Sequence, residues 1–170
     1  TVPYPDADRG EILRQVQLLT GVATAYQQEV RFVVLQTVGG RTDAVVVVRA
    51  PSGGWARAVL VRWRPDASFS VYGVESLSAD VDPQDVPVAW QEGGTAYVVG
   101  VPGATTVRLV TRAGDVDRVP LTGAVTEVPI RGRAFWAQFF DAADGERGVT
   151  EVAVARLSDQ VLAGPAPGAR

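Results

Sequence analysis

The sequence predicts a mainly β protein, an antiparallel β-sandwich in one or two lobes that is preceded by one N-terminal α-helix. Three observations favour this class. Apolar residues recur at helical spacing only near the N-terminus, β-branched runs follow from Glu29 onward, and short strands alternate with glycine and proline turns through the second half. This pattern is typical of hairpins and lacks the crossover helices that a parallel sheet requires.

Residues 1–28 are predicted to hold an extended segment and the helix. Asp8 and Glu11 have the spacing of a capping box, which satisfies exposed backbone N–H groups at a helix start. The apolar residues that follow share one side of a helix: Ile12, Val16, Leu19, Ala23 and Tyr26. We expect this helix, over about residues 8–27, to pack on the sheet or to tether it to an upstream segment; the alternative is a coiled coil or a partner-binding helix.

Residues 29–85 are predicted to form a first β lobe. Residues 30–38 and 42–50 flank a short glycine turn and are expected to pair as a hairpin. Residues 45–48 are four consecutive valines, which indicates a central strand covered on both faces. Further strands are expected over residues 55–63 and 68–74.

Arginine and tryptophan gather in this lobe and suggest a ligand surface, because guanidinium groups stack on indole rings. The residues concerned are Trp55, Arg57, Arg62, Trp63 and Arg64. Strand alternation separates Arg57 from Arg62 and Arg64, however, which divides the surface. We therefore expect ordinary edge or surface packing here.

Residues 79–87 mark the clearest internal boundary. Two prolines and three aspartates exclude a core strand, so we expect a loop or a linker between two lobes. Asp80, Asp82 and Asp85 are candidate oxygen ligands for Ca²⁺, but the segment lacks the glycine and terminal Glu of an EF-hand loop. A solvated connector is the interpretation we adopt.

Residues 86–164 are predicted to form a second, sandwich-like lobe, with a flexible tail at 165–170; one domain over 8–164 is the alternative. Its strands are separated by glycine, proline and aspartate turns. The expected strands are 88–92, 95–101, 105–112, 116–121, 126–130, 133–141 and 149–157.

The most distinctive stretch is RAFWAQFFDAADGERG, residues 133–148. Ideal alternation places Phe135 and Phe139 on one face of a strand and Trp136 and Phe140 on the other, which predicts an interior strand in the core of the second lobe. The segment 141–145, which contains two aspartates, has the composition of a type I turn with a left-handed glycine. A calcium loop is the alternative.

The residue types that are missing exclude most catalytic mechanisms. The sequence has no His, Cys, Lys, Met or Asn. This excludes a Ser-His-Asp triad, a Cys nucleophile, a Schiff-base lysine, a Walker A lysine and the usual zinc ligands. A carboxylate-based hydrolase is the remaining enzyme class, yet nearly all acids fall in turns or at strand ends. We expect no enzyme activity, no cofactor and no metal site, and assign no catalytic, cofactor-binding or metal-ligating residue.

Charge and hydropathy limit the partners. The net charge of -3 is small, with acids and arginines interspersed, so no nucleic-acid binding is expected. The chain begins at Thr1 and contains no apolar run of about 20 residues. We expect it to be an excised soluble region, with any signal peptide or membrane anchor outside it.

Residues 86–163 carry a family resemblance. The pattern VPGATTVRLVTRAGDVDRVPLTG, followed by an aromatic strand and DAADG, resembles immunoglobulin-like or small β-sandwich modules in extracytoplasmic regions of membrane-anchored actinobacterial proteins. The disulfide-forming cysteine pair of many immunoglobulin domains is absent. The resemblance implies an extracytoplasmic location, anchoring upstream of residue 1, and a binding or scaffolding role toward a protein or envelope polymer. The alternative is the sensor domain of an anchored, anti-sigma-like regulatory protein.

Overall fold

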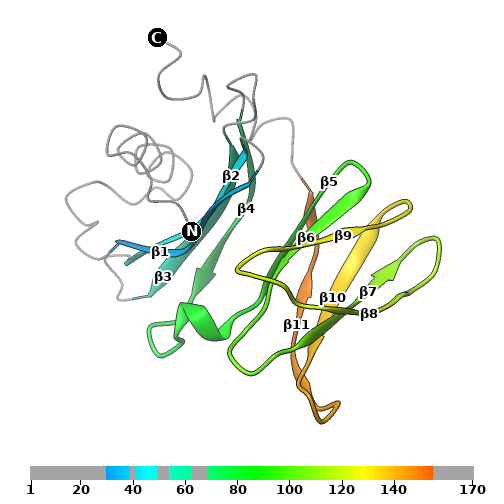
Figure 1. Ribbon diagram of the computed structural model, residues 1–170. Helices are drawn as coiled ribbons and strands as arrows, with labels where there is room; N and C mark the ends of the chain where they lie inside the picture. The colour runs from blue at the N-terminus through cyan, green and yellow to red at the C-terminus, as the bar shows by residue number, and fades with distance from the viewer. Residues whose placement is uncertain (1–29, 39–40, 50–53, 63–68, 155–170) are drawn as a thin grey trace. The chain divides into compact units, whose positions relative to one another are not determined.

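The computed structural model describes residues 30–38, 41–49, 54–62 and 69–154. The helix predicted within residues 1–28 and the tail predicted at 165–170 lie outside the described residues. The chain divides into two compact units, and the division falls between Pro83 and Gln84. We call the described residues up to Pro83 the first unit and Gln84–Val154 the second unit, and Figure 1 shows the strands of both.

The described part of the chain is mainly β, as predicted, and its strands form three four-stranded sheets. Every strand pairing in these sheets is antiparallel except that of β12 with β5. One sheet lies in the first unit and two lie in the second.

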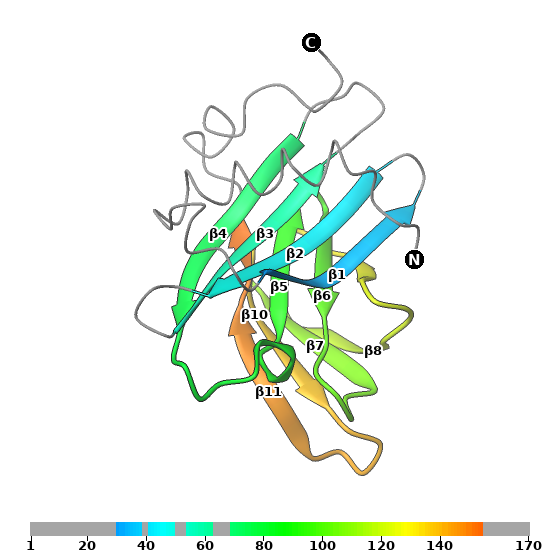
Figure 2. The same cartoon turned by 90° about the vertical axis from the view of Figure 1, so that its left-hand side faces the viewer.

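The first unit is a four-stranded antiparallel sheet in chain order, seen in Figure 2. Its strands are β1 (Val30–Val38), β2 (Arg41–Arg49), β3 (Trp55–Arg62) and β4 (Phe69–Leu77). Val38 pairs with Arg41, so the predicted hairpin is confirmed. The prediction of a central strand is also confirmed, because β2 lies between β1 and β3 and its valines 45–48 are fully buried.

The predicted arginine and tryptophan surface of the first unit is described only in part. The Arg49 guanidinium lies 4.0 Å from the centroid of the Trp55 ring. The side chains of Arg57 and Arg62 and all of Trp63 and Arg64 lie outside what the structure describes.

The second unit contains one sheet with the order β12-β5-β6-β9. Its strands are β5 (Val88–Glu92), β6 (Thr95–Val99), β9 (Thr126–Pro129) and β12 (Ala153–Val154). A short 3-10 helix, η2 (Pro83–Asp85), precedes β5. Gly93 adopts the left-handed backbone, with φ of 59°, in the two-residue turn that joins β5 and β6. The predicted turn at Gly93-Gly94 is therefore confirmed.

The other sheet of the second unit has the order β11-β10-β7-β8. Its strands are β7 (Thr106–Thr111), β8 (Val116–Pro120), β10 (Ala134–Phe140) and β11 (Glu146–Glu151). Along β7, residues alternate between half-buried and buried, as expected for a strand with one face on a core.

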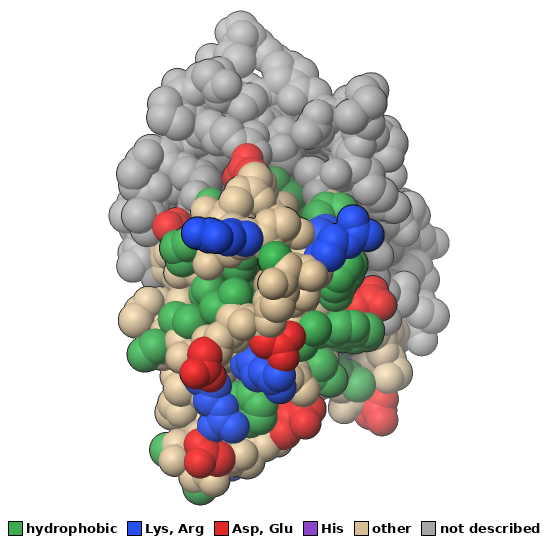
Figure 3. All heavy atoms as spheres, turned by 90° about the vertical axis from the view of Figure 1, so that its right-hand side faces the viewer, with side chains coloured by type: hydrophobic (Ala, Val, Ile, Leu, Met, Phe, Trp, Pro, Cys, Tyr) green, Lys and Arg blue, Asp and Glu red, His purple; other side chains and the backbone are tan. Residues whose placement is uncertain are grey.

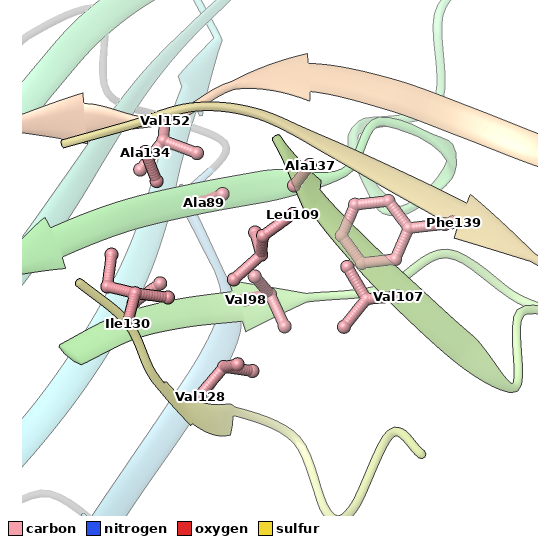
Figure 4. Close-up of a cluster of buried hydrophobic side chains, with 11 residues drawn as sticks. Ala89, Val98, Val107, Leu109, Val128, Ile130, Ala134, Ala137, Phe139 and Val152 are labelled. Atoms are coloured by element: carbon pink, nitrogen blue, oxygen red, sulfur yellow. The ribbon is translucent and has the colours of Figure 1, made fainter. Parts of the chain in front are cut away.

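Both sheets of the second unit contribute side chains to one apolar core, and Figure 4 shows these side chains gathered between the strands. Phe139 and Leu109, on β10 and β7, are fully buried, as is Ala96 on β6. The cluster comprises Ala89, Ala96, Val98, Val107, Leu109, Val128, Ile130, Ala134, Ala137, Phe139 and Val152. On the opposite side of the β5–β6 hairpin, the rings of Trp90 and Tyr97 are stacked with centroids 5.6 Å apart.

The last predicted strand, 149–157, is wrong in its bounds. β11 begins at Glu146 and ends at Glu151, and the chain then changes sheet to form β12 beside β5. Val152 makes this change: its side chain is buried in the core, and its N–H donates to the Phe135 carbonyl at 3.0 Å. Burial of one valine between the sheets thus separates two strands that look continuous in the sequence.

The alternation predicted for residues 135–140 is also wrong. β10 is an interior strand, as predicted, but its register with β7 shifts between Ala134 and Trp136. This irregularity interrupts the period of two, so that Phe135 is 39% exposed while Phe139 is fully buried. Ala137 lies in the core with Phe139, as the alternation predicts, whereas Ala134 fills the place where the Phe135 ring was expected.

Truncation of two phenylalanines on β10 should therefore have very different costs. We expect Phe139→Ala to lower the free energy of unfolding by about 3–5 kcal/mol because it leaves a cavity, and Phe135→Ala to lower it by about 1 kcal/mol or less. Urea unfolding of the two variants measures both values. Equal destabilisation would contradict the observed register of β10.

Candidate interaction surface

The exposed large apolar side chains of the described residues all lie in the second unit, and three of the four are on the paired strands β10 and β11. They are Phe135, Trp136, Val149 and Val154, which are 39%, 44%, 48% and 40% exposed. All four lie on β10, β11 or β12. We call Phe135, Trp136 and Val149 the aromatic patch. Because single exposed apolar residues are ordinary but grouped aromatic rings are not, this patch is the leading candidate for an interaction surface.

The strand register brings the members of the patch together. Trp136 lies opposite Glu151, and Gln138 lies opposite Val149. Trp136 and Val149 are therefore diagonal neighbours on the outer face of the sheet, within reach of a large ring. Phe135 joins them because the register shift turns its ring away from the core. A hollow of about 220 Å³ between these strands is lined by Arg133, Phe135, Trp136, Glu151 and Val152.

Arg133 holds the patch in shape. Its guanidinium lies 5.6 Å from the Phe135 ring centroid, and its Nη2 donates to the Val152 carbonyl at 2.8 Å. Its Nη1 donates to the Ala134 carbonyl. One side chain thus connects the start of β10 to the point where β11 gives way to β12, and its guanidinium restrains the Phe135 ring.

Ion pairs lie farther along the same sheet. Arg118 on β8 pairs with Asp144, and its guanidinium lies 3.9 Å from the centroid of the Phe140 ring. Arg108 on β7 pairs with Asp115. Figure 3 shows a face on which basic, acidic and apolar side chains are interspersed. These exposed pairs contribute little stability individually.

A second, larger hollow of about 430 Å³ lies where the β7–β8 turn meets the end of β9. It is lined by Thr111, Ala113, Gly114, Asp115, Val116, Pro129, Ile130 and Arg131. Its single carboxylate, that of Asp115, is already paired with Arg108. The hollow therefore lacks the two carboxylates that glycoside hydrolysis requires.

The acidic turn after β10 is held by the Asp141 side chain. Asp141 Oδ1 accepts from the N–H groups of Ala143 and Gly145 at 2.9 and 2.8 Å, and Oδ2 accepts from Arg147 Nε at 3.1 Å. The Asp141 N–H donates to the Gly145 carbonyl at 2.9 Å, which closes the hairpin. The predicted turn is present, and its first aspartate serves as its internal support.

The prediction of a left-handed glycine at this turn is wrong. Asp144 has the positive φ, 66°, and Gly145 does not. Glycine at 145 has a different effect: a Cβ there would come within 2.9 Å of Asp141 Oδ2, so a larger residue would shift that carboxylate. Asp144 can take the left-handed conformation because aspartate tolerates it better than most residues. Gly145, which has no side chain, leaves room for the Asp141 carboxylate.

The acids considered as calcium ligands do not form a cluster. Asp141 is engaged by the turn and by Arg147, and Asp144 is paired with Arg118. Across the described residues, which include Asp80, Asp82 and Asp85, no three residues of the types His, Cys, Asp and Glu come together as a metal site would require.

The hydrogen bonds of the turn hold the pKa of the Asp141 carboxyl below its ordinary value of 3.8, and the N–H of Gly145 is the largest cause. The Ala143 N–H and the Arg147 guanidinium act in the same direction. The turn is therefore built for the ionised carboxylate.

The sequence matches no family model, no curated protein and no solved structure. In the part of the chain that the structure describes, no helix is long and apolar enough to cross a membrane.

Stability should depend on pH through Asp141. Because the pKa is lowered in the folded protein, the contribution of Asp141 is complete above the ordinary value of 3.8 and is lost as pH falls through the lower folded pKa. We expect Asp141→Asn to lower the melting temperature near neutral pH, and the difference from wild type to shrink as pH falls below 3.8. Thermal unfolding monitored by circular dichroism measures this, and a difference that stays constant over the range would exclude the role.

Proposed function

We propose that the second unit is an immunoglobulin-like β-sandwich that acts as a non-catalytic binding module. The strand order supports the fold assignment. Of the seven strands β5 to β11, the first, second and fifth form one sheet and the others form the second, so the chain crosses repeatedly between two sheets that share a core. Seven short strands in two such layers are typical of immunoglobulin-like sandwiches.

The exposed aromatic patch is the observation that carries the proposed binding role. Phe and Trp rings together with arginine are enriched where proteins contact one another, and central aromatic residues supply much of the binding energy. Here Phe135 and Trp136 are exposed beside a hollow whose rim carries Arg133 and Glu151. The Arg133 contacts position the Phe135 ring in advance, which lowers the entropy lost on binding.

The partner in this proposal is a protein of the cell envelope. The patch combines the aliphatic Val149 with two rings and a polar rim, which suits apolar side chains of a protein at its centre and charged ones at its border. The extracytoplasmic location and the upstream anchor are supported by the family resemblance of residues 86–163. The sensor alternative depends on the helix predicted within residues 1–28, which lies outside the described residues, and no observation favours it.

Retention of the full chain on purified cell envelope from its source organism tests this function. We expect Trp136→Ala to weaken retention about tenfold or more, because truncation of a central aromatic residue commonly costs over 1.4 kcal/mol of binding free energy. Thr122→Ala, at an exposed position away from the patch, is the matched control and should bind like wild type. Melting temperatures of all three proteins verify that they are folded.

Two treatments of the envelope identify the partner class. Protease digestion of the envelope before binding should abolish retention, whereas glycan-hydrolase digestion should leave it intact. The opposite result would replace the protein partner with an envelope polymer. Retention of the folded Trp136→Ala variant at the wild-type level would refute the patch as the binding surface.

A further inference from the structure

The second unit has four sheet edges among its described strands, and three of them are poorly suited to pairing with another strand. β8 ends in Pro120, β9 ends in Pro129, and β12 has only two residues. Proline and short length are common devices that block the pairing of edge strands between molecules. β11 has six residues without proline and has one strand neighbour, β10, in the described sheet. Among the described strands of the second unit, β11 is therefore the edge best suited to pairing with another strand.

The pairing of β11 with β10 shows which of its backbone groups face outward. The N–H of Val152 donates to the Phe135 carbonyl, so positions 152 and 135 form a hydrogen-bonded pair. Such pairs alternate with non-hydrogen-bonded pairs in an antiparallel ladder. Glu151 opposite Trp136 is therefore a non-hydrogen-bonded pair, Thr150 opposite Ala137 is a hydrogen-bonded pair, and Val149 opposite Gln138 is again non-hydrogen-bonded. The N–H and C=O groups of Val149 and Glu151 consequently point away from β10.

The side chains beside these groups are suited to a contact. Val149 is 48% exposed, and Trp136 beside it is 44% exposed. The Thr150 hydroxyl approaches the Glu151 carbonyl at 3.4 Å, which leaves that oxygen a second lone pair. An added strand would thus find both a free ladder and adjacent apolar surface.

The sequence of β11 is complementary to itself when two copies run antiparallel. Pairing about Val149 places Val149 opposite Val149 of the second copy and Arg147 opposite Glu151. At the central position, this register joins the outward-facing backbone groups of Val149 in the two copies, whereas Arg147 lies at the irregularity in the pairing with β10. Opposite charges in cross-strand positions are favourable. The Arg147 side chain is 52% exposed and uses only Nε for Asp141, so its terminal nitrogens remain for a second carboxylate.

We propose that β11 pairs antiparallel with β11 of a second copy of this chain, with the two-fold axis at Val149. The two four-stranded β11-β10-β7-β8 sheets become one continuous sheet. The contact is isologous and closes on itself, so it forms a dimer and not a filament. It places the two Trp136 rings on the same outer face. This inference does not rest on the proposed function, since self-pairing needs no other partner.

A disulfide tests the register directly. The chain contains no cysteine, so a single introduced thiol can form a disulfide only between copies. Opposed hydrogen-bonded residues have Cα atoms about 5.5 Å apart, a distance that a disulfide spans. We expect mild oxidation to convert most Val149→Cys protein to a covalent dimer on a non-reducing gel. Asp117→Cys, exposed on the opposite edge strand β8, is the control and should remain monomeric.

Proline at the same position tests the backbone contact. Because the Val149 N–H faces away from β10, Val149→Pro should keep the internal ladder and remove the donor to the second copy. We expect sedimentation equilibrium to show dimer for wild type and Val149→Thr, and a dimer dissociation constant at least about tenfold weaker for Val149→Pro, since two symmetric hydrogen bonds are lost. Glu151→Arg places an arginine opposite Arg147 of the second copy, so like charges should weaken the dimer without altering the core.

Several results would overturn the proposal. A wild-type protein that is monomeric at about 100 μM would overturn it, because a stable dimer has a dissociation constant well below that concentration. Equal crosslinking of the Val149→Cys and Asp117→Cys variants would show random collision. A dimer unaffected by both Val149→Pro and Glu151→Arg would place the interface elsewhere. None of these results depends on envelope retention by the aromatic patch, so failure of one proposal is distinguishable from failure of the other.

Discussion

The register of β10 against β7 is the constraint on which the second unit depends. The shift between Ala134 and Trp136 places Ala134, Ala137 and Phe139 in the core and leaves Phe135 outside. With a regular ladder, Phe135 would share the core face with Ala137 and Phe139 and would enter the space that Ala134 now fills. Because protein interiors are close-packed, that one irregularity decides which residues of β10 fill the core and which rings remain exposed.

The exposed patch and the core are therefore two results of the same backbone feature. Arg133 lies at the start of β10 and donates to the carbonyls of Ala134 and Val152. Val152 is in turn the residue at which the chain passes from one sheet to the other. The rings of the patch are thus supported by groups that also join the sheets, so changes to the patch need controls for stability. This is why the proposed binding variants truncate an exposed ring and keep Arg133.

The acidic turn shows how a motif suggestive of a ligand can serve the fold. Asp141, Asp144 and Glu146 lie close in the sequence, as metal-binding acids often do. In the folded chain, Asp141 accepts from two backbone N–H groups and Asp144 pairs with Arg118 on another strand. The same segment leads into β11, whose open edge is the basis for the proposed dimer. The geometry of the acidic turn and the position of the edge strand are linked, because the turn determines where β11 begins.

The sequence by itself determined most of the strands, since periodicity and turn residues act over a few positions. It identified β2 as an interior strand from four consecutive valines, and β5 from the boundaries set by its flanking turns. Only the tertiary structure decided that Phe135 is exposed, that the chain changes sheet at Val152, and that Asp144 and not Gly145 takes the left-handed conformation. These features depend on contacts between residues far apart in the chain: the fit of β10 to β7, the space between two sheets, and the approach of a carboxylate to a turn. A local pattern carries no information about such fits, because the same residues satisfy the period in either register.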